Sequence, residues 1–394
     1  MNGPRTGDGL EVVRPAYGRA SLADVLPSAL AVLGVPGSPD PLHLTDQLPG
    51  VRRIAVLLVD GFGTYQLPAA SAIGGTIADL SAGRLGQHTP LTSGFPSTTP
   101  VSLVTLGTGA PPGSHGVLGI SLHVPGTDRV FDLLRWGDDP DPASWQPVPT
   151  QLERATAAGV RVTLVTRPEF DGTGLTTAAN RGGAFRGASD VDGLVTEILG
   201  ALSGDDAPVL VSGYYREMDK AGHVHGLTSP EWAGTAADVD ALITRLADGL
   251  PEDAALLVTA DHGQIDVPHN RRYDLDTDPR LSSGLRFVAG EPRVRYLHVT
   301  PGAEDDVIAA WRAVLGADAE VVSRAEAVAG GWFGPVAEPH LARIGDVVVI
   351  MRDLAAMMAS KHDPPSVATL IALHGANTAA EMSIPLFILR GSAS

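Results

Sequence analysis

The chain of 394 residues contains no cysteine, and this absence limits the chemistry it can perform. Disulfide bonds and thiolate metal sites are excluded, so any transition metal has to be bound by histidine and carboxylate side chains. Aromatic residues are also few, whereas glycine and proline are abundant. The composition is otherwise typical of a globular protein.

Long hydrophobic runs are missing as well. No stretch reaches the roughly 20 apolar residues of a transmembrane helix, so we expect no membrane span. The N-terminal region lacks the basic start, apolar core and small-residue cleavage site of a secretory signal. Its apolar segment at residues 22–34 is short, contains Asp24 and Pro27, and is typical of a helix. These features predict a cytoplasmic location.

Positively charged residues are few: the sequence has 28 lysines and arginines but 45 aspartates and glutamates, which gives a formal net charge of −17. Such a chain is poorly suited to binding a nucleic acid backbone, so we expect no nucleic acid polymer as a partner. A small anionic substrate is still compatible with this charge if bound metal ions supply local positive potential. The sequence carries no signal for the oligomeric state.

Seven short apolar runs predict buried strands, and helix-like segments separate them. One such segment, residues 229–250, opens with Ser229 as an N-cap and Pro230 in the first turn. Strands that alternate with helices predict an α/β fold with a central, largely parallel sheet covered on both faces. The seven runs lie at residues 53–60, 160–166, 207–215, 254–263, 293–299, 346–351 and 384–389.

Residues 273–345 differ from the rest of the chain. They are interrupted by "DTDPRLSSG" and "GGWFGPVAEPH" and contain a single strand–helix–strand pattern. A chain of this length is expected to form one large domain or a domain with an insertion. We therefore predict a small inserted lid at 273–345 and an α/β core formed by residues 1–272 and 346–394.

Carboxylates and histidines gather at the ends of the predicted elements. In open α/β sheets, ligands bind beyond the carboxyl ends of the strands. Three carboxylates and three imidazoles at such positions are able to hold divalent cations. They are Asp60 and Asp261–His262 at the ends of two apolar runs, Asp219 and His223 beyond a third, and His374 beyond the stretch "ATLIAL".

Each of these residues also has an ordinary structural explanation. A strand-end aspartate such as Asp60 often caps the following helix. Asp219 and His223 have the spacing of a surface i,i+4 pair. His374 could be a buried histidine with satisfied hydrogen bonds, and Asp261–His262 a polar turn. No single residue of the set identifies a metal site.

The stretch "GFPSTTPVSLVTLGTGAPPGSHG", residues 94–116, places two adjacent hydroxyls between Pro96 and Pro100. One interpretation is turn chemistry, because proline fixes φ and threonine hydroxyls bond nearby backbone groups. The other is that Thr98 or Thr99 is a nucleophile at a helix N-terminus. The stretch by itself is compatible with both.

The ordered combination of "LLVDGFG", "FPSTTP", "MDKAGHVHG", "TADHG" and "ALHG" resembles the alkaline phosphatase superfamily. More closely, it is similar to the type I phosphodiesterase/nucleotide pyrophosphatase branch, over roughly residues 50–390. The resemblance implies an alkaline-phosphatase-like sandwich with a central sheet flanked by helices. It also implies two divalent metal ions, expected to be Zn²⁺, with Mn²⁺ or Fe as alternatives.

The resemblance further implies which residues bind each ion. Asp60, Asp261 and His262 would hold one metal together with the oxygen of Thr99, and Asp219, His223 and His374 would hold the other. Thr99 would be the nucleophile, since metal coordination lowers the pKa of a hydroxyl. Pro100 suits the first turn of a helix whose N–H groups face the phosphoryl oxygens. Thr98 is the rival and could instead be a capping hydroxyl.

One departure from the family pattern concerns the phosphoryl contact. Ile120 stands where the resemblance leads us to expect an asparagine that holds a non-bridging phosphoryl oxygen. Candidate substitutes are the backbone N–H of Thr99 and the side chains of Ser121 and Asn180. No arginine has an obvious position for binding the extra negative charge of a phosphomonoester. Arg167 follows a strand end and could do so, although a surface arginine is the simpler interpretation. The sequence therefore leaves the preference for diesters or monoesters open.

Three further histidines are candidates of lower rank. His225 follows His223 closely and would point to the opposite side if the segment were extended. His115 belongs to the "SHG" turn and is expected to be structural. His362 in "SKHDPP" is expected to be an exposed loop residue.

The resemblance predicts a metal-dependent phosphohydrolase acting through a phospho-threonine intermediate. The expected substrate is small and phosphorylated, either a phosphodiester or a nucleotide pyrophosphate. The alternatives are a phosphomonoesterase or phosphonate hydrolase on the same fold, and a non-enzymatic protein that binds a phosphorylated ligand. A sulfatase is disfavoured, because the formylglycine motif is absent from the sequence.

Overall fold

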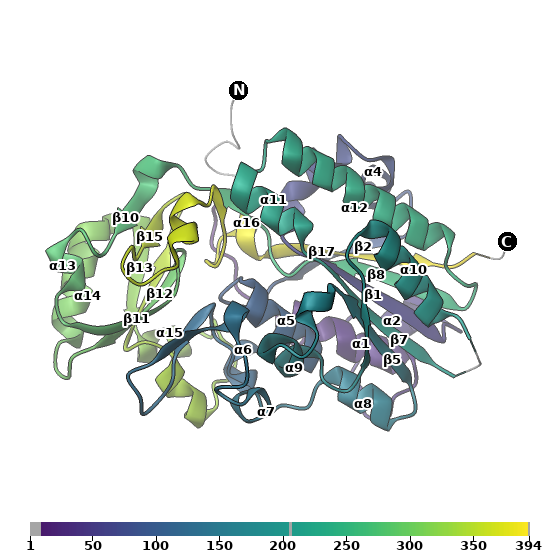
Figure 1. Cartoon of the computed structure of the whole chain (residues 1–394), viewed down its shortest axis with the longest axis horizontal. Coiled ribbons are helices and arrows are strands. Elements are labelled where there is room, and N and C mark those ends of the chain that lie inside the picture. Colours follow the sequence, from purple (N-terminus) through teal and green to yellow (C-terminus); the bar gives the residue numbers. More distant parts are fainter. Residues whose placement is uncertain (1–8, 205–206, 393–394) are drawn as a thin grey trace.

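The computed structural model describes residues 9–204 and 207–392. Its centre is a seven-stranded sheet (Figure 1) in which five neighbouring strands run parallel and two further strands join antiparallel at one side. This confirms the predicted α/β fold with a largely parallel sheet. In spatial order the strands are β2 (Gln87–Thr92), β17 (Ser383–Arg390), β8 (Ala254–Thr259), β1 (Arg53–Val59), β7 (Val209–Tyr215), β5 (Arg161–Thr166) and β6 (Ala184–Gly187).

Helices cover both faces of this sheet. In Figure 1, α10 (Val191–Leu202) and α12 (Pro230–Asp248) lie above it. Below it lie α1 (Val25–Val32), α5 (Thr99–Thr108), α8 (Gln151–Ala157) and α9 (Gly174–Asn180). The central strands β1 and β8 are buried almost throughout, which explains their continuous apolar sequences.

The predicted helix at residues 229–250 is confirmed as α12. The Ser229 side chain accepts a hydrogen bond from the Trp232 N–H, and Pro230 occupies the first turn. Both features satisfy the requirements of a helix N-terminus, where the first N–H groups lack partners within the helix. The apolar segment at 22–34 is also helical, as a 3-10 turn at Leu22–Asp24 followed by α1.

A smaller antiparallel sheet forms beside the first. Its strands, in spatial order, are β11 (Leu285–Glu291), β12 (Val294–Val299), β14 (Val347–Met351) and β13 (Ala319–Ser323). The helix α14 (Glu304–Leu315) connects β12 to β13, as the strand–helix–strand pattern predicts. The apolar run at 346–351 becomes β14, so this sheet extends past residue 345. The division into a core and an inserted lid at 273–345 stays a prediction.

Short elements complete the described chain. The helices are α2 (Leu44–Gln47), α3 (Leu67–Ser71), α4 (Gly75–Ser81), α6 (Pro112–His115), α7 (Pro142–Trp145), α11 (Glu217–His225), α13 (Pro279–Ser282), α15 (Arg324–Ala329) and α16 (Ala379–Met382). Three strand pairs are β3 (Ser121–His123) with β4 (Val130–Asp132), β9 (Ile265–Asp266) with β16 (Ala372–Leu373), and β10 (Arg272–Asp274) with β15 (Ala356–Met358).

Within residues 9–204 and 207–392, no helix has both the length and the apolar character required to traverse a bilayer. The cytoplasmic location inferred from the sequence stays a prediction.

Candidate metal centre

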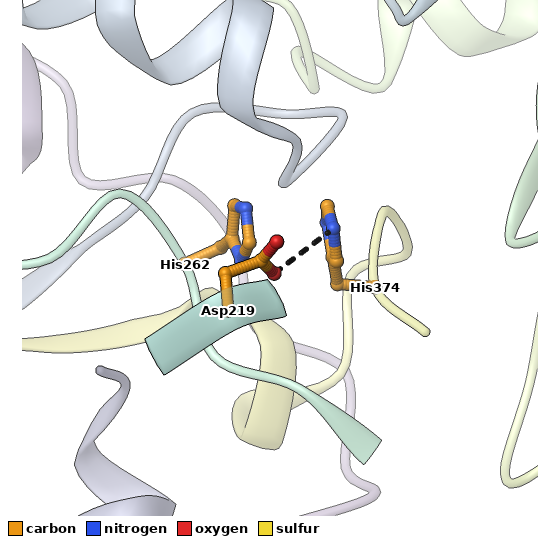
Figure 2. Close-up of side chains that lie close together, drawn as sticks. All are labelled: Asp219, His262 and His374. Atoms are coloured by element: carbon orange, nitrogen blue, oxygen red, sulfur yellow. Dashed lines mark ion pairs between the residues drawn. The ribbon is translucent and has the colours of Figure 1, made fainter. Parts of the chain in front are cut away.

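The six metal-ligand candidates of the sequence lie together at the carboxyl ends of the central strands. Asp60 directly follows β1, and Asp261 and His262 come two and three residues after β8. Asp219 and His223 lie on α11, which follows β7, and His374 follows β16. Figure 2 shows Asp219, His262 and His374 turned toward one another, although they come from three separate segments.

Asp60, Asp261 and His262 form one group, in which each residue offers a ligand atom within 4.8 Å of the others. The Nε2 atom of His262 lies 3.2 Å from Asp261 Oδ2 and 3.5 Å from Asp60 Oδ1. Thr99 Oγ1 is 3.2 Å from the same nitrogen. The Thr99 hydroxyl therefore lies beside the three residues that, by the family resemblance, would share a metal ion with it.

Asp219, His262 and His374 form a second group of the same size, which His223 extends. Asp219 Oδ1 lies 3.6 Å from His374 Nε2, the contact drawn in Figure 2, and Asp219 Oδ2 lies 3.3 Å from His223 Nε2. The rings of His262 and His374 stack with centroids 3.6 Å apart. Both expected ligand sets are thus assembled side by side, while the role of each residue stays a prediction.

The three histidines present the same nitrogen to the centre. Their Nδ1 atoms lie against backbone carbonyl oxygens: His223 at 2.7 Å from Ala372, His262 at 3.2 Å from Gly263 and His374 at 2.9 Å from Ser97. A carbonyl only accepts, so Nδ1 carries a proton, and in the neutral ring Nε2 then has the lone pair that can bind a metal ion. This arrangement is the usual way in which a protein orients a metal-binding histidine.

The donor set fits divalent cations. The Nε2 atoms of His223 and His374 are 3.2 Å apart, and two lone pairs at that distance repel unless a cation lies near both. Asp60 Oδ1 and Asp261 Oδ2 are buried with no hydrogen-bond partner in the described chain. Unpaired buried carboxylate oxygens are costly, and nitrogen and oxygen ligands of these types suit zinc and similar ions.

The electrostatics of the centre agree with this interpretation. Burial and then the negative charges of Asp261 and Asp219 raise the pKa of Asp60 well above its usual value. Burial and then the neighbouring His262 and His223 lower the pKa of His374 well below its usual value. The protein alone therefore crowds like charges together, and added positive charge would relieve the repulsion among the carboxylates.

Further contacts hold the carboxylates in place. Tyr214 donates its hydroxyl to Asp60 Oδ2, and Gln264 Nε2 donates to Asp219 Oδ1 at 2.5 Å. The Gly61 N–H donates to Asp261 Oδ1 at 3.0 Å. Gly61 has a φ of +73°, and a Cβ there would lie 2.9 Å from Asp219 Cα, so only glycine fits after Asp60.

Sequence reasoning missed the roles of Tyr214 and Gln264. Tyr214 lies inside an apolar run and is typical there of a buried strand residue. Gln264 follows His262 by two positions, and that proximity is the one signal from which its role could have been predicted.

Thr99 is the first residue of α5, with Pro100 in the first turn as predicted, and it is 8% exposed. Thr98 occupies the N-cap position, but its side chain makes no capping hydrogen bond. Its hydroxyl is buried and unpartnered within the described residues. The capping role considered for Thr98 is therefore not seen.

The candidate substitutes for the missing asparagine lie in different surroundings. Ser121 Oγ donates to the Gly290 carbonyl at 2.8 Å, and the Ile120 N–H donates to Glu291. Asn180 lines a cavity that Thr99 also lines. Arg167 is paired with Glu169 and Glu217 in a partly exposed network, which agrees with its interpretation as a surface arginine.

The remaining histidines do not join the centre. His225 lies on the helix α11, not on an extended segment, and is exposed. His115 bonds Thr105 Oγ1 and accepts from the Val117 N–H, which is a structural role. The side chain of His362 is about half exposed, and its Nε2 lies 3.7 Å from Asp276 Oδ1.

Known proteins provide an independent comparison. The chain is similar to an uncharacterized pyrophosphatase/phosphodiesterase of Schizosaccharomyces pombe, with 28% identity over 240 residues, which is 58% of this chain and 48% of that protein. The match thus spans about half the length of this curated relative.

Two solved structures are similar in fold. Murine ectonucleotide pyrophosphatase/phosphodiesterase 5, as an inactive variant in complex with AMP, matches with a TM-score of 0.68 and 19% identity over 85% of this chain and 87% of that one. The human protein of the same name matches with a TM-score of 0.63 and 18% identity, over 85% of this chain and 87% of that one. These matches confirm the expected alkaline-phosphatase-like fold.

The family assignment comes from the sequence. The family described as type I phosphodiesterase/nucleotide pyrophosphatase matches residues 54–377, which is most of the chain and includes all six ligand candidates. The chain therefore belongs to the type I phosphodiesterase/nucleotide pyrophosphatase family.

Proposed function

We propose that this protein is a metal-dependent phosphohydrolase that cleaves small phosphodiesters or nucleotide pyrophosphates through a phospho-threonine intermediate on Thr99. The observation that carries the proposal is the position of the Thr99 hydroxyl, 3.2 Å from His262 Nε2, at a buried cluster of carboxylates and inward-facing imidazoles. Family membership supports the reaction class. The AMP bound to the murine structural neighbour is compatible with a nucleotide-type substrate.

Two ions are proposed, because two ligand groups lie side by side. Asp60, Asp261 and His262 would hold one ion together with Thr99 Oγ1, and the second would be held by Asp219, His223 and His374. Zn²⁺ is expected, with Mn²⁺ or Fe as alternatives, because the ligands are nitrogen and oxygen only. When bound, such a pair lowers the pKa of a coordinated hydroxyl and neutralises phosphoryl charge.

Thr99 would act as the nucleophile. A lone pair of its Oγ1 forms the bond to phosphorus, and the bond to the leaving oxygen breaks with its electron pair. The hydroxyl proton passes to solvent, and the departing alcohol or nucleoside monophosphate takes one up. Water then hydrolyses the phospho-threonine, which releases the second product and restores Thr99. The first turn of α5 offers the N–H groups of Thr99 and Val101 to the phosphoryl oxygens, since Pro100 has none.

The ion pairs of Arg167 support a preference for diesters. A monoester has one more negative charge than a diester, and an arginine near the phosphoryl group would be needed to balance it. Arg167 is engaged with Glu169 and Glu217 instead. We therefore favour a phosphodiesterase over a phosphomonoesterase or phosphonate hydrolase.

The test compares Thr99→Ala with Thr98→Ala as a matched control. We expect Thr99→Ala to abolish hydrolysis of bis-p-nitrophenyl phosphate while elemental analysis still finds the metal, and Thr98→Ala to retain activity. Full activity of Thr99→Ala would overturn the assignment. Faster hydrolysis of p-nitrophenyl phosphate than of the diester would identify a monoesterase. Wild-type protein that holds two ions but cleaves no ester would be a phospholigand-binding protein.

A further inference from the structure

The helix that carries Thr99 contacts the segment after β8 at two places. Thr99 and Ser102 both belong to α5, and their i, i+3 spacing places them on one face of the helix. The Thr99 hydroxyl lies 3.2 Å from His262 Nε2, and the Ser102 hydroxyl donates to the Asp261 carbonyl oxygen at 3.0 Å. One face of one helix thus contacts two consecutive residues of the candidate metal centre.

The Ser102 contact is buried and fully satisfied. Ser102 and Ser93 are both 0% exposed, and the Ser93 hydroxyl donates to the same Asp261 carbonyl oxygen at 2.5 Å. A carbonyl oxygen has two lone pairs, so the two serines use both of them. The Ser102 N–H also donates to the Thr98 carbonyl at 2.9 Å, which closes the first turn of α5. Ser102 therefore connects the turn that holds Thr99 directly to Asp261.

A second attachment holds the same helix end to the other ligand group. The N–H and the hydroxyl of Ser97 donate, at 3.0 and 2.6 Å, to the carbonyl oxygens of the two residues that follow His374. The Ser97 carbonyl oxygen lies 2.9 Å from His374 Nδ1. Thr99 thus lies between two attachments, at Ser97 and at Ser102. With the first alone the turn could pivot, whereas the two together fix the position of the Thr99 hydroxyl.

We propose that Ser102 is a positioning residue, whose hydroxyl fixes the distance of Thr99 from Asp261 and His262. The inference rests on the proposed function and adds a residue to it. Reacting atoms have to lie about 3–3.5 Å apart, and a displacement of about 1 Å can lower a rate about 100-fold. The Asp261 carboxylate is oriented separately, because its Oδ1 accepts from the N–H groups of Gly61 and His262 at 3.0 and 2.9 Å. Loss of the Ser102 hydroxyl should therefore move the nucleophile and leave the carboxylate in place.

The experiment compares Ser102→Ala with the wild-type protein on bis-p-nitrophenyl phosphate. The variant should fold, because Ser93 still donates to the Asp261 carbonyl and no buried acceptor is left unpaired. We expect kcat to fall about 10- to 100-fold while KM changes less than about twofold. The metal content, measured by elemental analysis, should stay at the wild-type value. An unchanged kcat, or a loss that added metal restores, would overturn the inference.

Two control variants separate the attachment of α5 from the loss of any buried hydroxyl. Thr108 is on the same helix, is 2% exposed, and donates its hydroxyl at 2.6 Å to the Val104 carbonyl within that helix. Thr108→Ala should therefore keep the wild-type kcat. Ser93→Ala removes the other donor to the Asp261 carbonyl but leaves α5 attached, so it should lower kcat less than Ser102→Ala. An equal loss in either control would overturn the assignment to Ser102.

Crystal structures of the wild-type protein and Ser102→Ala provide a readout that does not depend on turnover. In the variant, the distance from Thr99 Oγ1 to His262 Nε2 should exceed the wild-type 3.2 Å by up to about 1 Å. An unmoved hydroxyl would overturn the inference even if kcat fell. A wild-type protein that hydrolyses no diester would refute the proposed function, whereas the position of Thr99 in the two structures would still decide whether Ser102 holds it.

Discussion

The substitution Glu381→Gln removes one charge from a fully buried ion pair beside the metal centre. Glu381 and Arg293 have 0% exposed side chains, and their two hydrogen bonds measure 3.0 Å (Nε to Oε1) and 2.8 Å (Nη2 to Oε2). Glu381 also accepts from the Ala376 N–H at 3.0 Å and the Thr378 hydroxyl at 2.6 Å. These contacts hold the loop that follows His374.

The same residue reaches the other side of the centre through its backbone. The Gly263 N–H donates to the Glu381 carbonyl at 2.9 Å, directly after His262. Glu381 thus connects the loops of His262 and His374. We expect its substitution to reduce metal affinity by about 10- to 100-fold, the effect typical of residues that orient metal ligands.

The expected loss of stability follows from the burial. Glutamine leaves the guanidinium of Arg293 without a counter-charge, and stranding one partner of a buried ion pair costs about 3–5 kcal/mol. The free energy of unfolding, measured by urea denaturation of the metal-free protein, should fall by this amount. The double variant with Arg293→Met and Glu381→Gln should lose less, because no charge is stranded and the glutamine oxygen can still accept from the loop that follows His374.

Glu320→Gln is the matched control. Glu320 pairs with Arg352 at 2.9 Å, but their side chains are 30% and 43% exposed. Exposed pairs contribute about 0–1 kcal/mol, so this variant should unfold almost like the wild type. The reasoning is refuted if Glu381→Gln costs no more than Glu320→Gln, or if the double variant is less stable than the single one.

Two further predictions concern the backbone at Gly61 and the protonation of Glu291. Gly61→Ala should lower the free energy of unfolding by at least about 1–2 kcal/mol because of the left-handed backbone, and the overlap of the new Cβ with Asp219 should add to this loss. Gly18 also has a positive φ, +75°, but no described atom lies within 4 Å of a Cβ there, so Gly18→Ala should show the backbone cost alone. Equal losses for the two variants in chemical denaturation would contradict this reasoning. Burial raises the pKa of Glu291 to about 8, so the carboxyl is protonated in the folded state and ionised in the unfolded state at intermediate pH. The free energy of unfolding should therefore fall between about pH 4.5 and 8, by up to about 1.4 kcal/mol per pH unit, and Glu291→Gln should remove this contribution; an unchanged slope in the variant would show that Glu291 is not its source.

The central sheet could be predicted because parallel strands that are buried on both faces need unbroken apolar sequences. The runs at 53–60 and 254–263 are of this kind, and they became β1 and β8. The run at 346–351 was predicted as a strand too, but it joins the smaller sheet. A buried strand has the same composition in either sheet, so the apolar pattern does not indicate its neighbours.

The candidate ligands could be predicted because strand ends and short spacings mark them in the sequence. Asp60 and Asp261 each follow an apolar run, and the helix α11 places Asp219 and His223 on one face. The pair of Arg293 and Glu381 was not predictable, since it joins segments 88 residues apart through tertiary contact. The cavity beside Thr99 was likewise not predictable, because two helices and several strands have to meet before it exists.

The carbonyl contacts of the three imidazole rings have an evolutionary consequence. Their partners at Ser97, Ala372 and Gly263 are main-chain oxygens, which every amino acid supplies equally. The side chains at positions 97 and 372 can therefore change over generations without turning the rings, provided that the path of the backbone is inherited. Gly263 is the exception, because a Cβ there would lie 2.1 Å from the Ala380 carbonyl oxygen. The sequence around these histidines can thus change while the orientation of their rings stays the same.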